Sequence, residues 1–145
     1  MDKASLAFIE TMGIFGAENG TPRSIYRIIG YLLICEPAAQ SAKEIQDTLK
    51  LSAGAVSNAL NLLRKSGMIR PISISGTRSL LYEIDPRSWK RTLEQRLRII
   101  PDTLQIIDSG LDLRPKNDRL LLMRKVYGIY EEETVSLLEK LDKIK

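Results

Sequence analysis

The chain has 145 residues, of which 43% are hydrophobic and 28% charged, a balance typical of a single folded domain with an added extension. The absence of histidine excludes Ser-His-Asp catalysis and His-ligated zinc, so we expect no enzyme, no metal and no cofactor. A single cysteine, the lack of a membrane-length apolar run and the lack of a signal peptide favour a cytoplasmic protein with no membrane partner.

The net charge of +4 is concentrated in the middle of the chain. Residues 41–91 carry nine basic and four acidic side chains, whereas residues 1–40 and 92–145 are close to neutral. A local positive field attracts polyanions, with nucleic acid as the first candidate. An ordinary solvated surface is the alternative explanation, because an excess of a few charges is common.

The first elements in chain order are two helices. Apolar spacing predicts a mostly buried helix over 4–16. Thr21 followed by Pro22 is typical of an N-cap with proline at the first helical position, and predicts an amphipathic helix over 22–35. Pro37 ends this second helix.

A helix-turn-helix is predicted next. Ser41 and Glu44 form a capping box that opens a short helix, and Ser52 is the N-cap of a longer helix over 52–66. Gly67 is expected to close that helix in a left-handed conformation. Two capped helices joined by a three- or four-residue turn make this motif.

The hydrophobic period then changes from helix to strand. Ile72 and Ile74 alternate with serines, and residues 80–84 alternate in the same way after a reversal around Gly76. A helix-turn-helix followed by a β-hairpin predicts a mainly α fold with a small β wing, a winged helix. We expect the winged helix-turn-helix DNA-binding domain over 18–88, with 1–17 and 89–145 forming a helical dimerisation region.

The remaining residues predict helices. Asp85-Pro86 begins one that Pro101 breaks or kinks, a loop lies between Ser109-Gly110 and Arg114-Pro115, and a last helix covers 116–144. Their apolar surface exceeds what a small winged helix can cover, which predicts a two-fold homodimer, the alternative being that they fold back on their own monomer. The candidate dimerisation residues are Leu93, Leu97, Leu104, Leu120, Tyr127, Leu138 and Leu141.

The candidate DNA-binding surface is the outward face of the helix over 52–66, together with the tip of the wing. Helical geometry places Asn58, Asn61 and Lys65 opposite the apolar side, and asparagine can bond adenine bidentately in the major groove. A wing arginine can enter the minor groove or pair with a phosphate. The full candidate set is Ser41, Lys43, Ser52, Ala53, Ser57, Asn58, Asn61, Arg64, Lys65, Thr77 and Arg78.

Four segments between Pro22 and Trp89 carry a family resemblance: TPRSIYRIIGYLLI, SAKEIQDTL, LSAGAVSNALNLLRKSGMIR and SGTRSLLYEIDPRSW. This stretch, about half of the chain, resembles the MarR superfamily of winged-helix transcriptional regulators, and more closely its GbsR-type branch. The resemblance implies a homodimeric regulator, in the first instance a repressor, of a palindromic double-stranded DNA operator. It also implies a small-molecule inducer, such as choline or a related osmolyte. Base reading would fall to Ser52, Ala53, Ser57, Asn58 and Asn61, and backbone contact to Arg78.

Two alternatives remain open. The neutral Asn- and Ser-rich helix face also suits a winged-helix module that binds protein instead of DNA. Cys35 could act as a redox switch, but a buried structural cysteine is the favoured interpretation, because free cysteine is among the most often buried residues.

Overall fold

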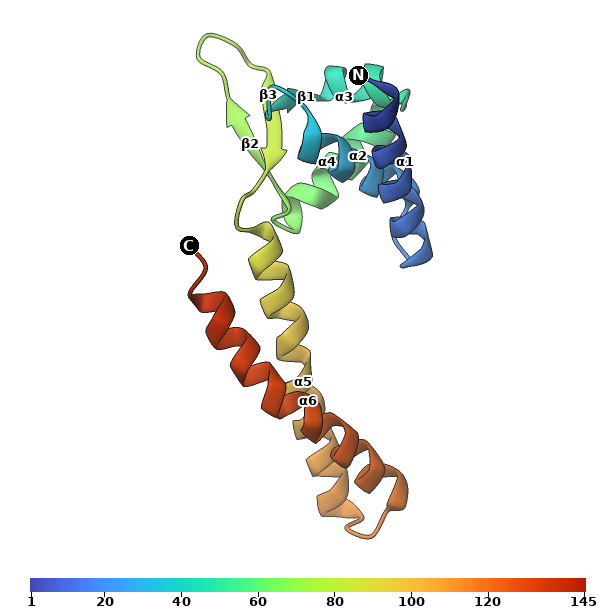
Figure 1. The fold of residues 1–145 in the computed structure, drawn as a ribbon, viewed down its shortest axis with the longest axis vertical. Helices are drawn as coiled ribbons and strands as arrows, with labels where there is room; N and C mark the ends of the chain where they lie inside the picture. Colours follow the sequence, from blue (N-terminus) through green and yellow to red (C-terminus); the bar gives the residue numbers. More distant parts are fainter. The chain divides into compact units, whose positions relative to one another are not determined.

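The computed structural model describes residues 1–145, which divide into two compact units, Met1–Ser88 and Trp89–Lys145 (Figure 1). The first unit contains four helices and three strands, and the second a pair of long helices. In chain order the elements are α1 (Lys3–Glu18), α2 (Arg23–Ile34), β1 (Gln40–Ser41), α3 (Ala42–Leu49), α4 (Ala53–Lys65), β2 (Ile69–Ser73), β3 (Leu80–Ile84), α5 (Ser88–Leu113) and α6 (Asp118–Asp142). None of the helices combines the length and the apolar character that a membrane-spanning segment requires.

The predicted helix-turn-helix is formed by α3 and α4. The capping box is present: the Ser41 hydroxyl accepts from the Glu44 amide, and the Glu44 carboxylate accepts from the Ser41 amide at 2.7 Å. Gly67 closes α4 with φ +75°, and the amides of Gly67 and Met68 donate to carbonyls of the last helical turn. The caps therefore fix both ends of this motif, as the sequence predicts.

The start of α2 differs from the prediction. Pro22 is itself the N-cap, with extended φ −52° and ψ 135°, and no side chain caps the helix, so the expected role of Thr21 as N-cap is wrong. The Thr21 amide instead donates to the Gly16 carbonyl at 2.9 Å and the Gly20 amide to the Ala17 carbonyl at 3.2 Å, with Gly20 at φ +81°. Thr21 thus belongs to the C-terminal cap of α1. The connection between α1 and α2 is so short that the residue expected to cap the second helix is used by the first.

The sheet has three antiparallel strands in the order β1-β3-β2. The wing pairs Ile69 with Ile84 at its base and Ser73 with Leu80 near its tip. The first strand of the wing begins three residues before the predicted Ile72, and Ile74 lies beyond its end. The sequence analysis missed β1, in which Gln40 and Ser41 pair with Tyr82 and Leu81 and attach the wing to the start of α3.

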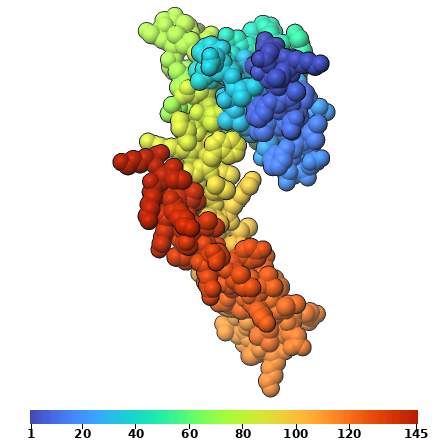
Figure 2. Space-filling view, viewed as in Figure 1, coloured from blue at the N-terminus to red at the C-terminus, as the bar shows by residue number.

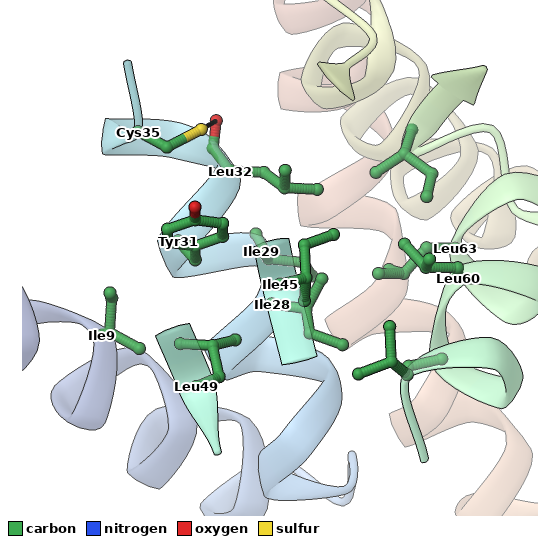
Figure 3. Packing of buried hydrophobic residues seen from close by; sticks show 13 residues of the cluster. Ile9, Ile28, Ile29, Tyr31, Leu32, Cys35, Ile45, Leu49, Leu60 and Leu63 are labelled. Atoms are coloured by element: carbon green, nitrogen blue, oxygen red, sulfur yellow. Dashed lines mark hydrogen bonds between the residues drawn. The ribbon is translucent and has the colours of Figure 1, made fainter. Parts of the chain in front are cut away.

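The hydrophobic core of the first unit lies between α1, α2, α3 and α4 (Figure 3). Ile9 of α1, Ile28 of α2, Ile45 of α3 and Val56 of α4 are completely buried. α1 packs against α2 in this unit, and its expected part in dimerisation stays a prediction. The helix-turn-helix and the wing therefore pack against the same hydrophobic core. This arrangement is a winged-helix fold.

The second unit is an antiparallel hairpin of α5 and α6. Lys90 near the start of α5 donates to the carbonyl of Ile144 at 3.4 Å, and Asp108 near its end pairs with Arg124 of α6 at 2.8 Å. α5 is helical from Ser88 to Leu113, so the predicted break at Pro101 and the predicted loop starting at Ser109-Gly110 are both wrong. The alternative of a kink at Pro101 stays a prediction. The connection to α6 is confined to residues 114–117.

The continuity of α5 has a physical reason. A proline inside a helix removes one hydrogen bond and costs about 3 kcal/mol, an amount that a few well-packed residues offset. Leu104 and Ile107, on the two turns after Pro101, are both buried. Gly110 then lies close to Leu120, whose Cδ1 would be 3.0 Å from an added Cβ, so the two helices approach each other closely at this point.

Candidate nucleic-acid interface

The orientation of α4 agrees with the periodicity of its sequence. Its buried side carries Val56, Ala59, Leu60 and Leu63, each no more than 5% exposed. Asn58, Asn61 and the remaining polar side chains of the helix are exposed on the opposite side. The side chains able to bond base edges therefore face away from the core.

The N-terminus of α4 is bare of large side chains. Ser52 Oγ accepts from the Ala55 amide at 3.1 Å, so this hydroxyl serves the helix cap. Ala53 and Gly54 follow, and a Cβ added at Gly54 would meet no atom within 4 Å. The first amides of the helix can thus be approached closely by another molecule, and such amides favour an anion.

Two adjoining concave surfaces run from α4 to the wing. The first, of about 280 Å³, lies between α3, α4 and β3, and the second, of about 450 Å³, lies between the start of α3 and the wing. Both are lined by Ala42, Gln46 and Tyr82, so they form one continuous depression, which we call the interface groove. Its other lining residues are Ser41, Lys43, Ala53, Ser57, Asn58, Leu60, Asn61, Arg64, Arg78, Ser79 and Leu80.

The interface groove brings together eight of the eleven candidate DNA-binding residues, which come from α4, from the N-terminus of α3 and from the wing. Ser52, Lys65 and Thr77 do not line it. Lys65 is exposed in the last turn of α4. The Thr77 hydroxyl accepts from the Ser79 amide at 2.9 Å, which occupies it within the turn of the wing.

Gln46 and Tyr82 are groove residues that sequence reasoning missed. A signal for Gln46 was present, since Ile45 and Leu49 are buried and a residue one position after Ile45 falls on the flank of α3. The alternating pattern of β3 did not indicate that Tyr82 lines the groove. Its position depends on the pairing of β3 with β1, a strand that the sequence analysis had not predicted. The two-residue strand places Tyr82 opposite Gln40 and beside the helix-turn-helix.

The basic side chains of this surface differ in how far they are already neutralised. Lys43 pairs with Asp47 at 2.9 Å, in an exposed contact of the kind that contributes little, and Arg70 at the base of the wing bonds Glu83 at 2.7 Å. Arg64 of α4 and Arg78 of the wing form no ion pair within the protein. The charge available to an anionic partner therefore lies at the two ends of the interface groove.

The wing tip is a tight turn. The Thr77 amide donates to the Ile74 carbonyl at 3.3 Å, and Gly76 at the third position of this turn has φ +82°, which favours glycine. Residues 75–79 are all exposed. The turn thus projects Arg78 into solvent, as expected for a wing that contacts a second molecule.

Cys35 lies away from the interface groove, at the C-terminus of α2. The thiol is buried and approaches the carbonyl oxygens of Leu32 at 3.8 Å and Ala38 at 3.5 Å. Burial raises the pKa of the Cys35 thiol, which keeps it protonated and poorly reactive at neutral pH. The predicted burial of this cysteine is confirmed, and its structural role stays a prediction.

A helix-turn-helix joined to a three-stranded sheet with a projecting hairpin defines a winged-helix protein, and comparison with known proteins agrees with that class. No family model matches the chain. The chain is 27% identical over 135 residues to the HTH-type transcriptional regulator MmpR5 of Mycobacterium tuberculosis, which covers 90% of this chain and 82% of that protein.

One solved structure shows the same fold. A crystal structure of a transcriptional regulator superposes with a TM-score of 0.72 at 24% identity, over 97% of this chain and 99% of the other. The adhesin competence repressor AdcR of Streptococcus pyogenes, at 17% identity and covering 92% of this chain and 97% of its own, gives a TM-score of only 0.41 and adds nothing to the fold assignment.

Proposed function

We propose that the protein is a sequence-specific double-stranded DNA-binding transcriptional regulator. The observation that carries this proposal is the interface groove, which gathers outward asparagines of α4, the start of α3 and the unpaired Arg78 of the wing on one surface. The similarity to MmpR5, named as a transcriptional regulator, supports the same function and points away from an enzyme.

Each part of the groove has a role in this proposal. α4 enters the major groove, where Asn58 and Asn61 bond base edges and supply sequence specificity. The exposed amides at Ala53 and Gly54 approach a phosphate, and Arg64 neutralises another. Arg78 reaches the adjacent minor groove or the backbone from the wing.

The proposal includes a homodimer that binds a palindromic operator. Most large apolar side chains of α5 and α6 remain exposed, among them Ile106 at 72% and Ile129 at 66%. Figure 2 shows one face of these two helices in space-filling form, coloured from yellow to red along the sequence. Such a surface on a two-helix hairpin needs a partner, and a second copy is the partner that gives two recognition helices. Half-sites one DNA turn apart, about 34 Å, would then be read together.

Not all of the candidate dimerisation residues are equally available for this contact. Leu104 is only 3% exposed and is already covered by its own chain, whereas Leu93 is 46% exposed. Leu97, Leu120, Tyr127, Leu138 and Leu141 are half-buried. The interface is therefore expected to centre on the strongly exposed residues that were not in the candidate set, Ile99, Ile106, Leu122 and Ile129.

Repression, membership of the MarR superfamily and its GbsR-type branch, and response to a small-molecule inducer are part of the same proposal. They rest on the resemblance of the segment from Pro22 to Trp89 and on the similarity to MmpR5. A cytoplasmic location accords with this function.

The test is selection of binding sites from genomic DNA with the purified protein, followed by a salt titration on the selected duplex. Counterion release predicts that the logarithm of the association constant falls linearly with the logarithm of the salt concentration, with a slope of about −0.9 per phosphate neutralised. No enrichment of any sequence, or a flat salt response, would overturn the proposal and favour a protein-binding module.

A further inference from the structure

One arginine of α2 connects α1 to the end of α3. Glu10 of α1 accepts from Arg23 Nη2 at 2.6 Å and from Arg27 Nε at 2.7 Å. The second terminal nitrogen of Arg27, Nη2, donates to the carbonyl oxygen of Leu49 at 3.1 Å. A single guanidinium thus bonds a carboxylate on the first helix and a main-chain oxygen of the helix-turn-helix.

The carbonyl of Leu49 occupies a sensitive position. It is the last residue of α3, and the last carbonyls of a helix have no partner within the helix. Lys50 follows in the left-handed conformation with φ +55°, and the Leu51 amide donates to the Gln46 carbonyl at 3.2 Å. Ser52, the N-cap of α4, comes immediately afterwards. The bond from Arg27 therefore lies at the turn that sets the direction of α4 relative to α3.

The surroundings of Arg27 restrict it to this path. A Cβ added to Gly13 would lie 2.6 Å from Arg27 Cγ and 2.9 Å from Arg23 Cγ, so the bare glycine lets both stems pass directly over α1. The Arg27 side chain is 20% exposed and that of Arg23 is 55% exposed. Arg27 is therefore held in place by packing and by two acceptors, which lowers the entropy lost in fixing the turn.

We propose that Arg27, oriented by Glu10, is a positioning residue for DNA binding: it caps α3 and fixes the turn that sets the direction of α4. This inference rests on the proposed function. It assigns α1 a second role besides packing, because any shift of α1 that displaces Glu10 also releases the cap on the Leu49 carbonyl.

Arg23 supplies a matched control. It bonds the same carboxylate at 2.6 Å, belongs to the same helix and carries the same charge, but it makes no bond to α3. Arg23→Met and Arg27→Met therefore remove one charge and one ion pair each, and only the second removes the cap.

The experiment compares the two variants in hydrogen exchange and in binding to the selected duplex. Arg27→Met should speed exchange of the Leu51 and Ala55 amides relative to the core amides and weaken duplex binding about tenfold, the effect of losing one charge-assisted hydrogen bond. Arg23→Met should leave the turn amides unchanged and weaken binding less than about threefold, the loss of a single long-range charge. Equal effects of the two variants in both measurements would overturn the inference.

A second variant covers the case in which Arg27→Met does not fold. Glu10→Ala keeps the arginine but removes its anchor, and should speed exchange of the Leu51 amide with an unchanged circular dichroism spectrum. Unchanged exchange in Glu10→Ala would count against the positioning role. Because exchange is measured without DNA, failure of the wild-type protein to bind any duplex would overturn the proposed function alone.

Discussion

The hydroxyl of Tyr31 in α2 donates a 2.6 Å hydrogen bond to the side-chain oxygen of Gln40 in β1, and both residues are buried. The Gln40 amide nitrogen in turn donates to the Pro37 carbonyl at 2.6 Å. This chain of bonds attaches the short strand β1, and through it the wing, to the core helix α2.

Removing the Tyr31 hydroxyl should therefore destabilise the first unit. Tyr31→Phe leaves the buried Gln40 oxygen without its donor, and we expect a loss of about 1–3 kcal/mol in the free energy of unfolding, measured by urea denaturation. Tyr130→Phe, at a residue that is 59% exposed, is the control and should change stability by less than about 0.5 kcal/mol. Equal stability of the two variants would show that this bond contributes nothing.

The asparagines of α4 should read bases and the wing arginine should not. Asn58→Ala should cost about 1–3 kcal/mol of affinity for the selected duplex and relax the preference at one position. Arg78→Ala should weaken binding evenly across sequences and reduce the salt slope by about 1. Titrations on a panel of single-base variants of the duplex separate the two effects, and an unchanged sequence preference in Asn58→Ala would contradict base reading.

Gly54 offers a test in which stability and binding move in opposite directions. Glycine inside a helix costs up to about 1 kcal/mol relative to alanine, and a Cβ at Gly54 would meet nothing in the protein. Gly54→Ala should thus raise the melting temperature but weaken duplex binding, because the methyl group stands between the helix start and DNA. The melting temperature, measured without DNA, reports the gain in stability separately from the loss of binding. If Gly54→Ala binds as well as the wild type, close approach at this point is not required.

Acid should weaken the contact between α1 and α2. Burial alone would raise the pKa of Glu10, but the hydrogen bonds from Arg23 and Arg27 outweigh it and lower the pKa below its usual value near 4.3. The ionised carboxylate therefore stabilises the fold at any pH above the pKa that Glu10 has in the unfolded chain. This contribution is lost as the pH falls through the lower pKa that Glu10 has in the folded protein. Because Glu10 is 40% exposed, solvent screening keeps the effect small.

The measurement is the free energy of unfolding between about pH 6 and pH 3, the range over which a glutamate titrates. Glu10→Gln should give a shallower loss of stability with acid than the wild type. A wild-type slope in Glu10→Gln would show that the two arginines do not stabilise the ionised form.

A charge placed on the apolar surface of the α5–α6 hairpin should prevent association with the proposed second copy of the chain. Ile106→Glu and Ile129→Glu should each convert the proposed dimer to a monomer in sedimentation equilibrium and reduce affinity for the selected duplex, since a monomer would read one half-site. Glu132→Gln in α6 should leave the association unchanged. Dimers of normal affinity in both glutamate variants would place the interface elsewhere.

The helix-turn-helix and the wing were predictable because short-range sequence signals, such as helix caps and turn residues, specify them. The Ser41–Glu44 box, the Ser52 cap and Gly67 each depend on neighbours within three residues, so the sequence carried the information directly. The outward face of α4 followed from the same periodicity, and with it most of the residues that line one side of the interface groove.

The remaining features depend on contacts between distant residues. A strand of two residues, Gln40–Ser41, has no periodicity and exists only because Tyr82 and Leu81 lie beside it. Pro101 remains helical because of packing, which a propensity scale does not contain. The bond from Arg27 to Leu49 joins residues that no local pattern relates.

All members of the buried core cluster fall between Ile9 and Ile69. A fragment that ends at Ser88 would therefore keep the complete interior of the first unit and should fold on its own as a monomer. Such a truncated species would separate what one winged helix contributes to affinity from what tethering two of them adds.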